Sequence, residues 1–506
     1  MRFTIRRAAL TGALGLISSQ AAQAQDGTFD PAWPVEGRNM YTSDASAIDE
    51  GTSVAVRSDG TVVLGGNCQR NDPDLDAGIC LRWLHPNGVP LGNGFGGYRK
   101  TVLADYQDHF PGNPQIAVHG LAVQRDDRLV LASAEFNGGL IESRVVRLKR
   151  AGEFEALADG AYYRRVLFQP GIDPAVMSDL VGEVVIAPDG KIVVAGSTSC
   201  RSTTACMSTD SDIGVARFNA DMTPDTGFGS DGAQTIYVDL GGANYDTARA
   251  VAVQRDGKIV VAGTARTAVM DPATSSGVLA RLNPDGGLDA SFGDGGKVVI
   301  SPGLQIRGNA AVPPWVSRGD IKTISEVYAV AIDRRGRILV TGTVFSTWGF
   351  SYQFVARFTS AGMLDNSFSN DNGENGILFV DLGELPANPQ TSTGLGLILQ
   401  GDEKILVYGS TLTSHATPNT SVWTMSRLLP SGNSDPSFST GAYGGYSPPQ
   451  GPSMTTLNDA RGAIIAHGGL ILVGRAYDKG ASDASYFGVA KLRLDAIFKD
   501  GFDSPQ

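Results

Sequence analysis

The sequence predicts an all-β fold, a seven-bladed β-propeller built of four-stranded antiparallel blades of about 67 residues each. The length of 506 residues excludes one simple core, because single hydrophobic cores stop growing at roughly 250 to 300 residues. The composition is 42% apolar and 18% charged, with 64 glycines, which is typical of short strands joined by tight turns. The third observation is a hairpin unit that recurs seven times.

The clearest copy of this unit begins with a hairpin over 250–263, in which two apolar, β-branched runs meet at an Asp-Gly turn. Asp-Gly between such runs is a strong hairpin signal. A third strand follows, then a Pro-Asp-Gly turn and an Asp-x-x-Phe-Gly segment that leads into a fourth strand at 297–300. One unit therefore supplies four strands.

Seven such hairpins occupy most of the chain and leave no room for a separate catalytic domain. Their turns lie at Asp59-Gly60, Asp126-Asp127, Asp189-Gly190, Asp256-Gly257, Arg335-Gly336, Asp402-Glu403 and His467-Gly468. The hairpins close at Gly66, Ser133, Gly196, Gly263, Gly342, Gly409 and Gly474. A single sheet cannot bury both faces, and a radial arrangement removes most exposed sheet edges. An open β-solenoid is the alternative, but its parallel coils fit hairpins less well.

Each third strand carries a basic residue at one recurring position, and four units add an Asp and a Phe downstream of it. The basic residues are Arg82, Arg147, Arg217, Arg281, Arg357, Arg427 and Lys491. The complete triplets are Arg217, Asp225 and Phe228; Arg281, Asp289 and Phe292; Arg357, Asp365 and Phe368; and Arg427, Asp435 and Phe438. They suggest either a ring of cations around the axis or a structural Arg to Asp bridge. We favour the bridge, because such bidentate pairs suit partly buried anchors.

The last unit lacks the downstream Asp and Phe at the usual spacing, which predicts that another segment completes it. Asp26-Gly-Thr-Phe29 near the N-terminus matches the missing pattern, so we expect an N-terminal clasp that closes the ring. The competing segment is Asp495-Ala-Ile-Phe498, which has the pattern at the wrong distance from Lys491.

The repeats resemble one known family. Asp-Gly-Lys-Ile-Val-Val-Ala-Gly at 189–196 and 256–263, with Ala-Arg-Leu-Asn-Pro-Asp-Gly-Gly-Leu-Asp-Ala-Ser-Phe-Gly at 280–293, is similar to the delta-60 repeat family of exported bacterial proteins. The resemblance covers nearly all of the chain after residue 24 and implies a propeller and export. It supplies no catalytic residues.

The first 24 residues predict an export signal. Arg2, Arg6 and Arg7 precede an uncharged run, and Ala22-Gln-Ala24 is a small-x-small cleavage pattern. We therefore divide the chain into a signal peptide (1–24), the propeller (25–494) and a short tail (495–506), and expect a periplasmic, cell-surface or secreted protein.

The cysteines fit this address as two local disulfides, Cys68 with Cys80 and Cys200 with Cys206. An even count in an exported chain favours disulfides. Both pairs fall in the same loop of different units, which favours this connectivity over the other two that four cysteines allow. Zinc is disfavoured because tight cysteine pairs with histidine partners are missing.

The charge and hydropathy exclude two classes of partner. Lys plus Arg is 41 against 52 for Asp plus Glu, so the basic surface expected of a nucleic-acid-binding protein is missing. No stretch after the signal approaches the roughly 18 apolar residues of a membrane span. We expect a monomer that binds a protein or a glycan.

Two departures from the repeat are candidate binding sites. The longest unit carries extra chain at 301–326, whose Arg307, Trp315, Arg318 and Asp320 could bind a sugar or protein. The alternative is a Trp that caps a blade edge. Asp72, Asp74 and Asp76 alternate as in a calcium loop, although the glycine at its sixth position is missing. Calcium is therefore the one cofactor to consider, and none is otherwise expected.

No catalytic motif accompanies these residues. The histidines lie at unrelated places in their units, and the nucleophile elbow, zinc-protease and phosphate-loop patterns do not occur. The sequence favours an exported binding or scaffold module. The alternatives are a carbohydrate-active enzyme, a glycoside hydrolase or lyase with carboxylates at the propeller channel mouth, such as Asp108 or Asp44, Asp49 and Glu50, or a purely structural surface-layer protein.

Overall fold

The structure, a computed structural model, describes most of the repeat region and part of each loop. The described residues are 29–34, 38–41, 48–69, 78–91, 115–137, 140–150, 152–200, 210–240, 245–267, 275–300, 321–346, 351–369, 376–380, 391–413, 420–438, 455–478 and 485–494. The predicted signal peptide and the C-terminal tail lie outside them.

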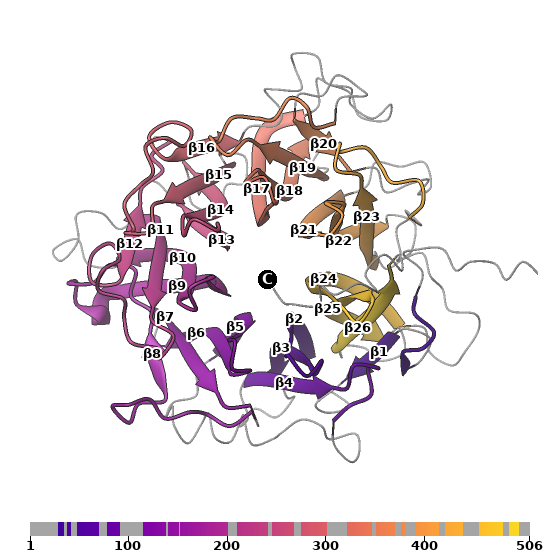
Figure 1. The fold of residues 1–506 in the computed structure, drawn as a ribbon, viewed down its shortest axis with the longest axis horizontal. Coiled ribbons are helices and arrows are strands. Elements are labelled where there is room, and N and C mark those ends of the chain that lie inside the picture. The colour runs from indigo at the N-terminus through magenta and orange to yellow at the C-terminus, as the bar shows by residue number, and fades with distance from the viewer. Residues whose placement is uncertain are drawn as a thin grey trace, which may run out of the picture.

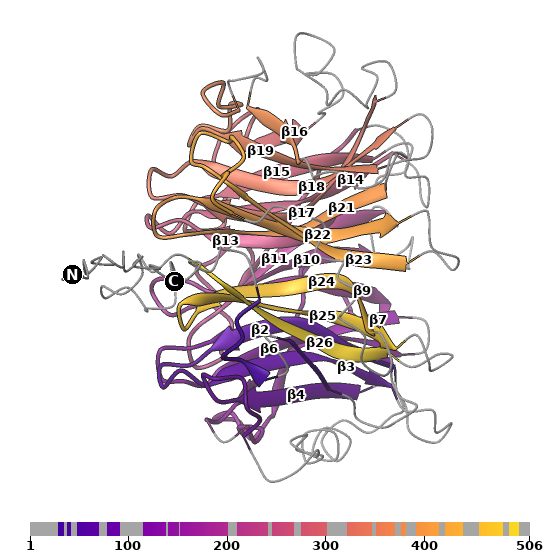
Figure 2. The same cartoon turned by 90° about the vertical axis from the view of Figure 1, so that its right-hand side faces the viewer.

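Seven antiparallel sheets surround one axis, which confirms the predicted seven-bladed propeller (Figures 1 and 2). Blades one to three are β2 (Ile48–Val56), β3 (Val62–Gln69) and β4 (Gly78–Leu84); β5 (Gln115–Val123), β6 (Leu129–Asn137), β7 (Leu140–Leu148) and β8 (Tyr163–Arg165); and β9 (Met177–Ile186), β10 (Ile192–Cys200), β11 (Ser211–Phe218) and β12 (Ala233–Ile236). Blades four and five are β13 (Thr247–Val253), β14 (Ile259–Arg266), β15 (Ser275–Leu282) and β16 (Lys297–Ile300); and β17 (Ile321–Ile332), β18 (Ile338–Ser346), β19 (Ser351–Phe358) and β20 (Ile377–Phe379).

The last two blades complete the ring. They are β21 (Thr391–Leu399), β22 (Ile405–Thr413) and β23 (Thr420–Leu428); and β24 (Thr455–Ala466), β25 (Gly469–Asp478), β26 (Ser485–Arg493) and β1 (Arg38–Tyr41). Blades one and six have three strands in the described part of the chain, where four were expected. A 3-10 turn at Pro174–Val176 interrupts the all-β pattern.

The hairpin turns need one residue in the left-handed region, and the degenerate units keep that conformation without glycine. Gly257 has φ +83°, whereas Asp127 and Glu403 at the equivalent position both have φ +65°. Only glycine adopts this region without steric cost. Asp127 is compensated by the preceding blade, because its carboxylate accepts hydrogen bonds from the backbone N–H and the hydroxyl of Ser58, at 2.8 and 2.6 Å.

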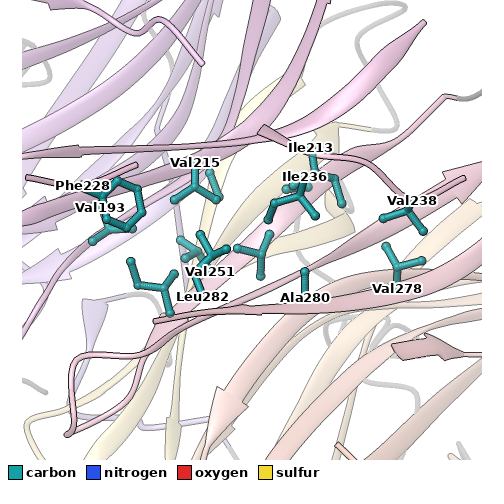
Figure 3. Close-up of a cluster of buried hydrophobic side chains, with 14 of the residues drawn as sticks. Val193, Ile213, Val215, Phe228, Ile236, Val238, Val251, Val278, Ala280 and Leu282 are labelled. Atoms are coloured by element: carbon teal, nitrogen blue, oxygen red, sulfur yellow. The ribbon is translucent and has the colours of Figure 1, made fainter. Parts of the chain in front are cut away.

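The hydrophobic core lies between the blades and is divided into seven clusters, one for each blade-to-blade interface. Figure 3 shows the cluster between blades three and four, where Val193 and Val215 face Val251 and Val278. Both faces of a blade are therefore apolar, as the continuous hydrophobic runs of the second and third strands predict.

The recurring Arg, Asp and Phe form a contact between successive blades, which we call the blade lock. Nε of Arg217 donates to Oδ2 of Asp225 at 2.6 Å, and the guanidinium carbon lies 4.4 Å from the centre of the Phe228 ring. Nη1 of Arg217 donates to the carbonyl of Pro284 in the next blade at 2.6 Å. The Phe228 ring packs against Gly286 of that blade, where a Cβ atom would come within 3.1 Å of it.

The same lock recurs in the other three complete units. Arg281, Arg357 and Arg427 each donate Nε to their Asp at 2.8 Å and stack on their Phe at 4.5 to 4.8 Å. These arginines are buried on the third strand of each blade. They are anchors between blades and do not form a cationic ring around the axis.

In the first blade the predicted basic residue is wrong by one position. The pairing of Val63 with Trp83 corresponds to that of Val260 with Arg281, so Trp83, and not Arg82, occupies the lock position. Its ring lies against Gly152 of the second blade, 2.6 Å from where a Cβ would stand. The sequence pattern selected Arg82 because its charge matches that of the basic residues in the other units.

The N-terminal segment closes the ring, as predicted, but through residues four positions later. Strand β1 pairs with β26, and Phe29 bridges Leu492 as Leu288 bridges Leu282 in the fourth blade. Asp30 therefore takes the lock position expected for Asp26, and its carboxylate lies 3.1 Å from Nζ of Lys491. The competing segment at 495–498 lies outside the described residues.

Trp33 takes the place of the lock Phe in this closing contact. Lys491 lies over its ring at 5.8 Å, and its Nε1 donates to the carbonyl of Pro86 in the first blade at 3.2 Å. The indole N–H thus makes the bond to the next blade that the arginine makes elsewhere. The ring packs on Gly88, where a Cβ would come within 2.6 Å of it.

We predict that Asp30→Asn lowers the free energy of unfolding by about 1 to 3 kcal/mol, because it removes a charged acceptor from partly buried Lys491. Asp26→Asn is the matched control and should change it by less than about 0.5 kcal/mol. Urea unfolding followed by tryptophan fluorescence measures both. A larger loss of unfolding free energy in Asp26→Asn than in Asp30→Asn would instead support Asp26 as the residue that closes the ring.

Candidate functional site: the axial ring

Most residues that the sequence analysis selected for binding lie outside the described part of the chain. These are Arg307, Trp315, Arg318, Asp320, Asp72, Asp74, Asp76, Asp44 and Asp108. Asp49 and Glu50 are described and lie on the innermost strand of the first blade, Asp49 fully buried.

The cysteines are described only in part. Cys80 and Cys200 are buried in β4 and β10. The side chain of Cys68 and all of Cys206 lie outside the described residues. The two disulfides therefore remain predictions.

The structure reveals a different candidate site on the innermost strands. Each of these seven strands contains a β-bulge at the same place, where one residue lies between two successive pairs of the ladder. The bulged residues are Thr52, His119, Gly182, Arg249, Tyr328, Leu395 and Arg461. We call these seven residues the axial ring.

The axial ring lies on the seven strands nearest the propeller axis. Figure 1 places β2, β5, β9, β13, β17, β21 and β24 closest to the centre of the molecule. All seven ring residues are half-buried or exposed, and the side chain of Arg461 keeps 43% of its accessible surface. A bulge re-aims a side chain away from the ladder and is common next to binding sites.

The ring position has a nearly constant place in the repeat but carries six different kinds of residue, arginine being the one that occurs twice. It lies 14 residues before the hairpin's closing position in six units and 13 before it in the seventh. The blade lock recurs complete in four units and with substitute residues in the first and last blades, whereas the ring position does not repeat in chemistry. Repeat comparison discards such variation, which is why the sequence analysis missed the ring. The constant spacing was the available signal.

Arg249 and Tyr328 of neighbouring blades form one half of the site. The guanidinium carbon of Arg249 lies 5.1 Å from the centre of the Tyr328 ring. The Tyr328 hydroxyl donates to Oε2 of Glu326 at 2.5 Å, and Glu326 is ion-paired with Arg266. Burial and Glu326 raise the pKa of Tyr328, so the phenol keeps its proton and holds the ring in place.

Arg461 and His119 approach the axis from other blades. Nη2 of Arg461 lies 2.7 Å from Oε1 of Glu50 in the neighbouring blade. Burial, together with the positive charges of Arg249 and Arg461, lowers the pKa of His119 to about 4. The imidazole is therefore neutral at neutral pH and can both donate and accept a hydrogen bond.

Glu183 follows the ring position of the third blade and is the most perturbed carboxyl near the axis. Its Oε2 accepts a hydrogen bond from the backbone N–H of Val251 at 2.7 Å. Burial raises its pKa to about 7. Burial, with a smaller contribution from the charge of Glu183, raises the pKa of Tyr408, whose ring lies over Gly396. A carboxyl that titrates near neutrality can exchange a proton there.

Within the described residues, the site offers hydrogen-bonding and charged groups but no metal-ligating cluster. No described helix is long and apolar enough to cross a membrane. A small pocket between blades six and seven is lined by apolar groups, among them Phe29, Trp423 and Met425. Thr424 is the one polar residue in its lining, so the axial ring, with several polar and charged groups, is the stronger candidate.

Comparisons with known proteins support the class of fold. Residues 187–228, 254–292 and 336–368 match a family model described as a β-propeller domain of unknown function (DUF5122). These segments fall in blades three to five, where the lock is complete. This match and the closed arrangement of seven blades identify a β-propeller repeat protein. No curated protein matches the chain significantly.

Several solved structures are similar at low identity. Polysaccharide lyase Uly1 is 13% identical, with a TM-score of 0.43 and coverage of 93% of this chain and 98% of the lyase. A protein of unknown function from Dyadobacter fermentans is 11% identical, with a TM-score of 0.39 and coverage of 91% and 98%. A thermostable family-43 glycoside hydrolase is 12% identical, with a TM-score of 0.31 and coverage of 64% and 95%.

We predict that Glu183→Gln stabilises the protein at high pH. The folded protein holds the Glu183 proton up to about pH 7, whereas the reference value is 4.5, so the stability from this group falls as pH rises between those values. The full difference is on the order of 3 kcal/mol. Gln keeps an acceptor for Val251, and the variant should lose this part of the pH dependence.

Urea unfolding from pH 4.5 to 8 measures the effect as the difference between variant and wild type. This difference isolates Glu183 from other buried acids such as Asp246, whose pKa burial also raises to about 7. Glu153→Gln, at an exposed turn position, is the control and should leave the wild-type pH dependence unchanged. If the free energy of unfolding depends on pH in the same way for Glu183→Gln and wild type, the raised pKa of Glu183 is contradicted.

Proposed function

We propose that this protein is an exported binding or scaffold module of the delta-60 repeat family, acting at the cell envelope or outside the cell, whose ligand binds at the axial ring. The observation that carries the proposal is the contrast between two sets of positions. The lock residues repeat because folding requires them, whereas the ring position has constant geometry and variable chemistry. Such variation on a rigid frame is what ligand recognition needs.

The rest of the chain supports a module devoted to binding. The seven repeats use nearly all residues after the predicted leader, so we place the binding function of this chain on the propeller. The leader and the even number of cysteines favour an oxidising compartment outside the cytoplasm. Half-buried polar groups from several blades around one axis suit a glycan or a protein loop.

A carbohydrate-active enzyme, either a glycoside hydrolase or a lyase, is the second candidate, and Glu183 is the observation that favours it. With a pKa of about 7, this carboxyl holds a proton over much of the physiological range and could serve as a general acid. Glycoside hydrolysis also needs a second carboxylate about 5 to 10 Å away. Glu50 and Glu326 are carboxylates on other innermost strands, each paired with an arginine. Loss of turnover in Glu183→Gln with binding retained would favour this candidate.

We predict that Leu395→Trp abolishes ligand binding, because the larger ring would fill space at the axis. Met363→Trp introduces the same ring at a turn where the wild-type residue is 66% exposed, and it should bind as wild type does. Binding of all three proteins to an array of bacterial envelope and plant glycans measures the effect.

Glycan signals that survive in Leu395→Trp would place the binding surface away from the axis. Signals lost in both variants would indicate damage to the fold, which the thermal midpoints check independently. A wild-type protein that binds no glycan would contradict a glycan ligand.

We also predict that the protein purified from a periplasmic or culture fraction begins at Gln25 and contains two disulfides. Intact mass before and after reduction and alkylation measures both features. A retained leader or four free thiols would contradict export by this route. Peptide mapping under non-reducing conditions distinguishes the local pairs from the other two connectivities.

A further inference from the structure

Arg249 is an exposed arginine whose charge is not balanced by a described carboxylate. Its guanidinium stacks on Tyr328, and no ion pair is found for it in the described part of the chain. The two other arginines near the axis differ, since Arg461 is paired with Glu50 and Arg266 with Glu326. Arg249 therefore carries the one uncompensated positive charge among the described groups at the axial ring.

The surroundings of Arg249 hold it in a defined position. Tyr328 is fixed by its hydrogen bond to Glu326, and Glu326 is fixed by Arg266. When a guanidinium stacks on an aromatic ring, its N–H groups lie in its own plane and point away from the ring. They remain available to donate hydrogen bonds. This arrangement leaves a planar fork that matches a carboxylate.

Two more ring residues complete a site around Arg249. His119, Arg249 and Arg461 belong to blades two, four and seven, so the sevenfold arrangement brings them to the axis from three sides. Each of the three is the bulged residue of an innermost strand, and the positive charges of Arg249 and Arg461, after burial, contribute to the lowered pKa of His119.

The charges of the site favour a single negative charge over two. Glu50, Asp459 and Glu326 flank the arginines, and Asp459 lies 3.9 Å from Nη2 of Arg461. A dianion such as phosphate would meet repulsion from these carboxylates, whereas a carboxylate matches the single free charge of Arg249. The same carboxylates and Thr52 can bind hydroxyl groups.

We infer that the axial ring binds the carboxylate of a hydroxylated acid with the chemistry of a uronic acid, and that Arg249 is the residue that pairs with it. The inference rests on the proposed binding function of the ring and adds the chemical class of the ligand. His119 and Arg461 contact the same sugar from the other blades, and Glu50 accepts hydrogen bonds from its hydroxyl groups.

Calorimetric titration of the full-length mature protein tests the inference. The probes are trimers of galacturonate and of glucuronate, their methyl esters, and inorganic phosphate and sulfate. The wild type should bind a uronate trimer at least tenfold more tightly than its methyl ester and than either inorganic anion. Affinity should fall with ionic strength, since one charge pair is formed.

Matched arginine variants assign the contact. Arg249→Gln should weaken uronate binding at least tenfold, and Arg249→Lys should weaken it less, because it keeps the charge but loses the fork. Arg255→Gln makes the same change of charge at an exposed turn of the same blade and should bind as wild type does. Unchanged thermal midpoints exclude misfolding.

Three outcomes would overturn the inference: uronate binding that Arg249→Gln leaves unchanged, equal binding of the methyl ester, or tighter binding of phosphate. These outcomes differ from failure of the proposed function. If neutral glycans bind and Leu395→Trp abolishes that binding while Arg249→Gln does not, the axial site stands and the uronate ligand is wrong. If the wild type binds none of the glycans, the uronate inference fails, and a protein is the remaining class of ligand for the axial ring.

Discussion

The structure depends on the contact between neighbouring blades. Each blade is apolar on both faces and cannot be buried without a neighbour on either side, so the seven clusters of the core exist only in a closed ring. The blade lock adds directed hydrogen bonds between successive blades to this apolar packing. A buried guanidinium is costly unless its N–H groups are satisfied, and the lock satisfies them with an Asp of the same blade and a carbonyl of the next.

Ring closure follows from the same requirement but uses different side chains. Lys491 pairs with Asp30 but lacks the planar fork through which arginine binds an Asp and the carbonyl of the next blade together. Trp33 supplies the missing donor through its indole nitrogen and the missing packing through its ring. The sequence pattern had matched Asp26 and Phe29 because it looked for a phenylalanine. Phe29 sets the register of the N-terminal segment against β26, because it forms a β-bridge with Leu492. This register places the next residue, Asp30, at the lock position.

The sequence predicted well those features that every blade must share. The Asp-Gly turns, the apolar runs and the Arg, Asp and Phe triplets follow from local geometry and from burial, so they recur and can be recognised without a structure. Trp83 escaped recognition because it fills the lock position by packing alone, without charge. The axial ring escaped it because the seven residues share only a backbone position, and backbone geometry at a bulge is not visible in side-chain identity.

This difference in constraint explains where function can develop on the fold. A bulged residue on the innermost strand takes no part in the ladder. The ring holds Gly182, Leu395 and Arg249 at equivalent positions, although Gly182 lies so close to the backbone of Ala248 that no side chain fits there. The lock positions accept far fewer residues, since a change there leaves a charge or a cavity between blades. The lock contacts lie on the third strand of a blade and the ring position on its innermost strand, so a substitution at the ring position leaves the lock contacts between blades in place.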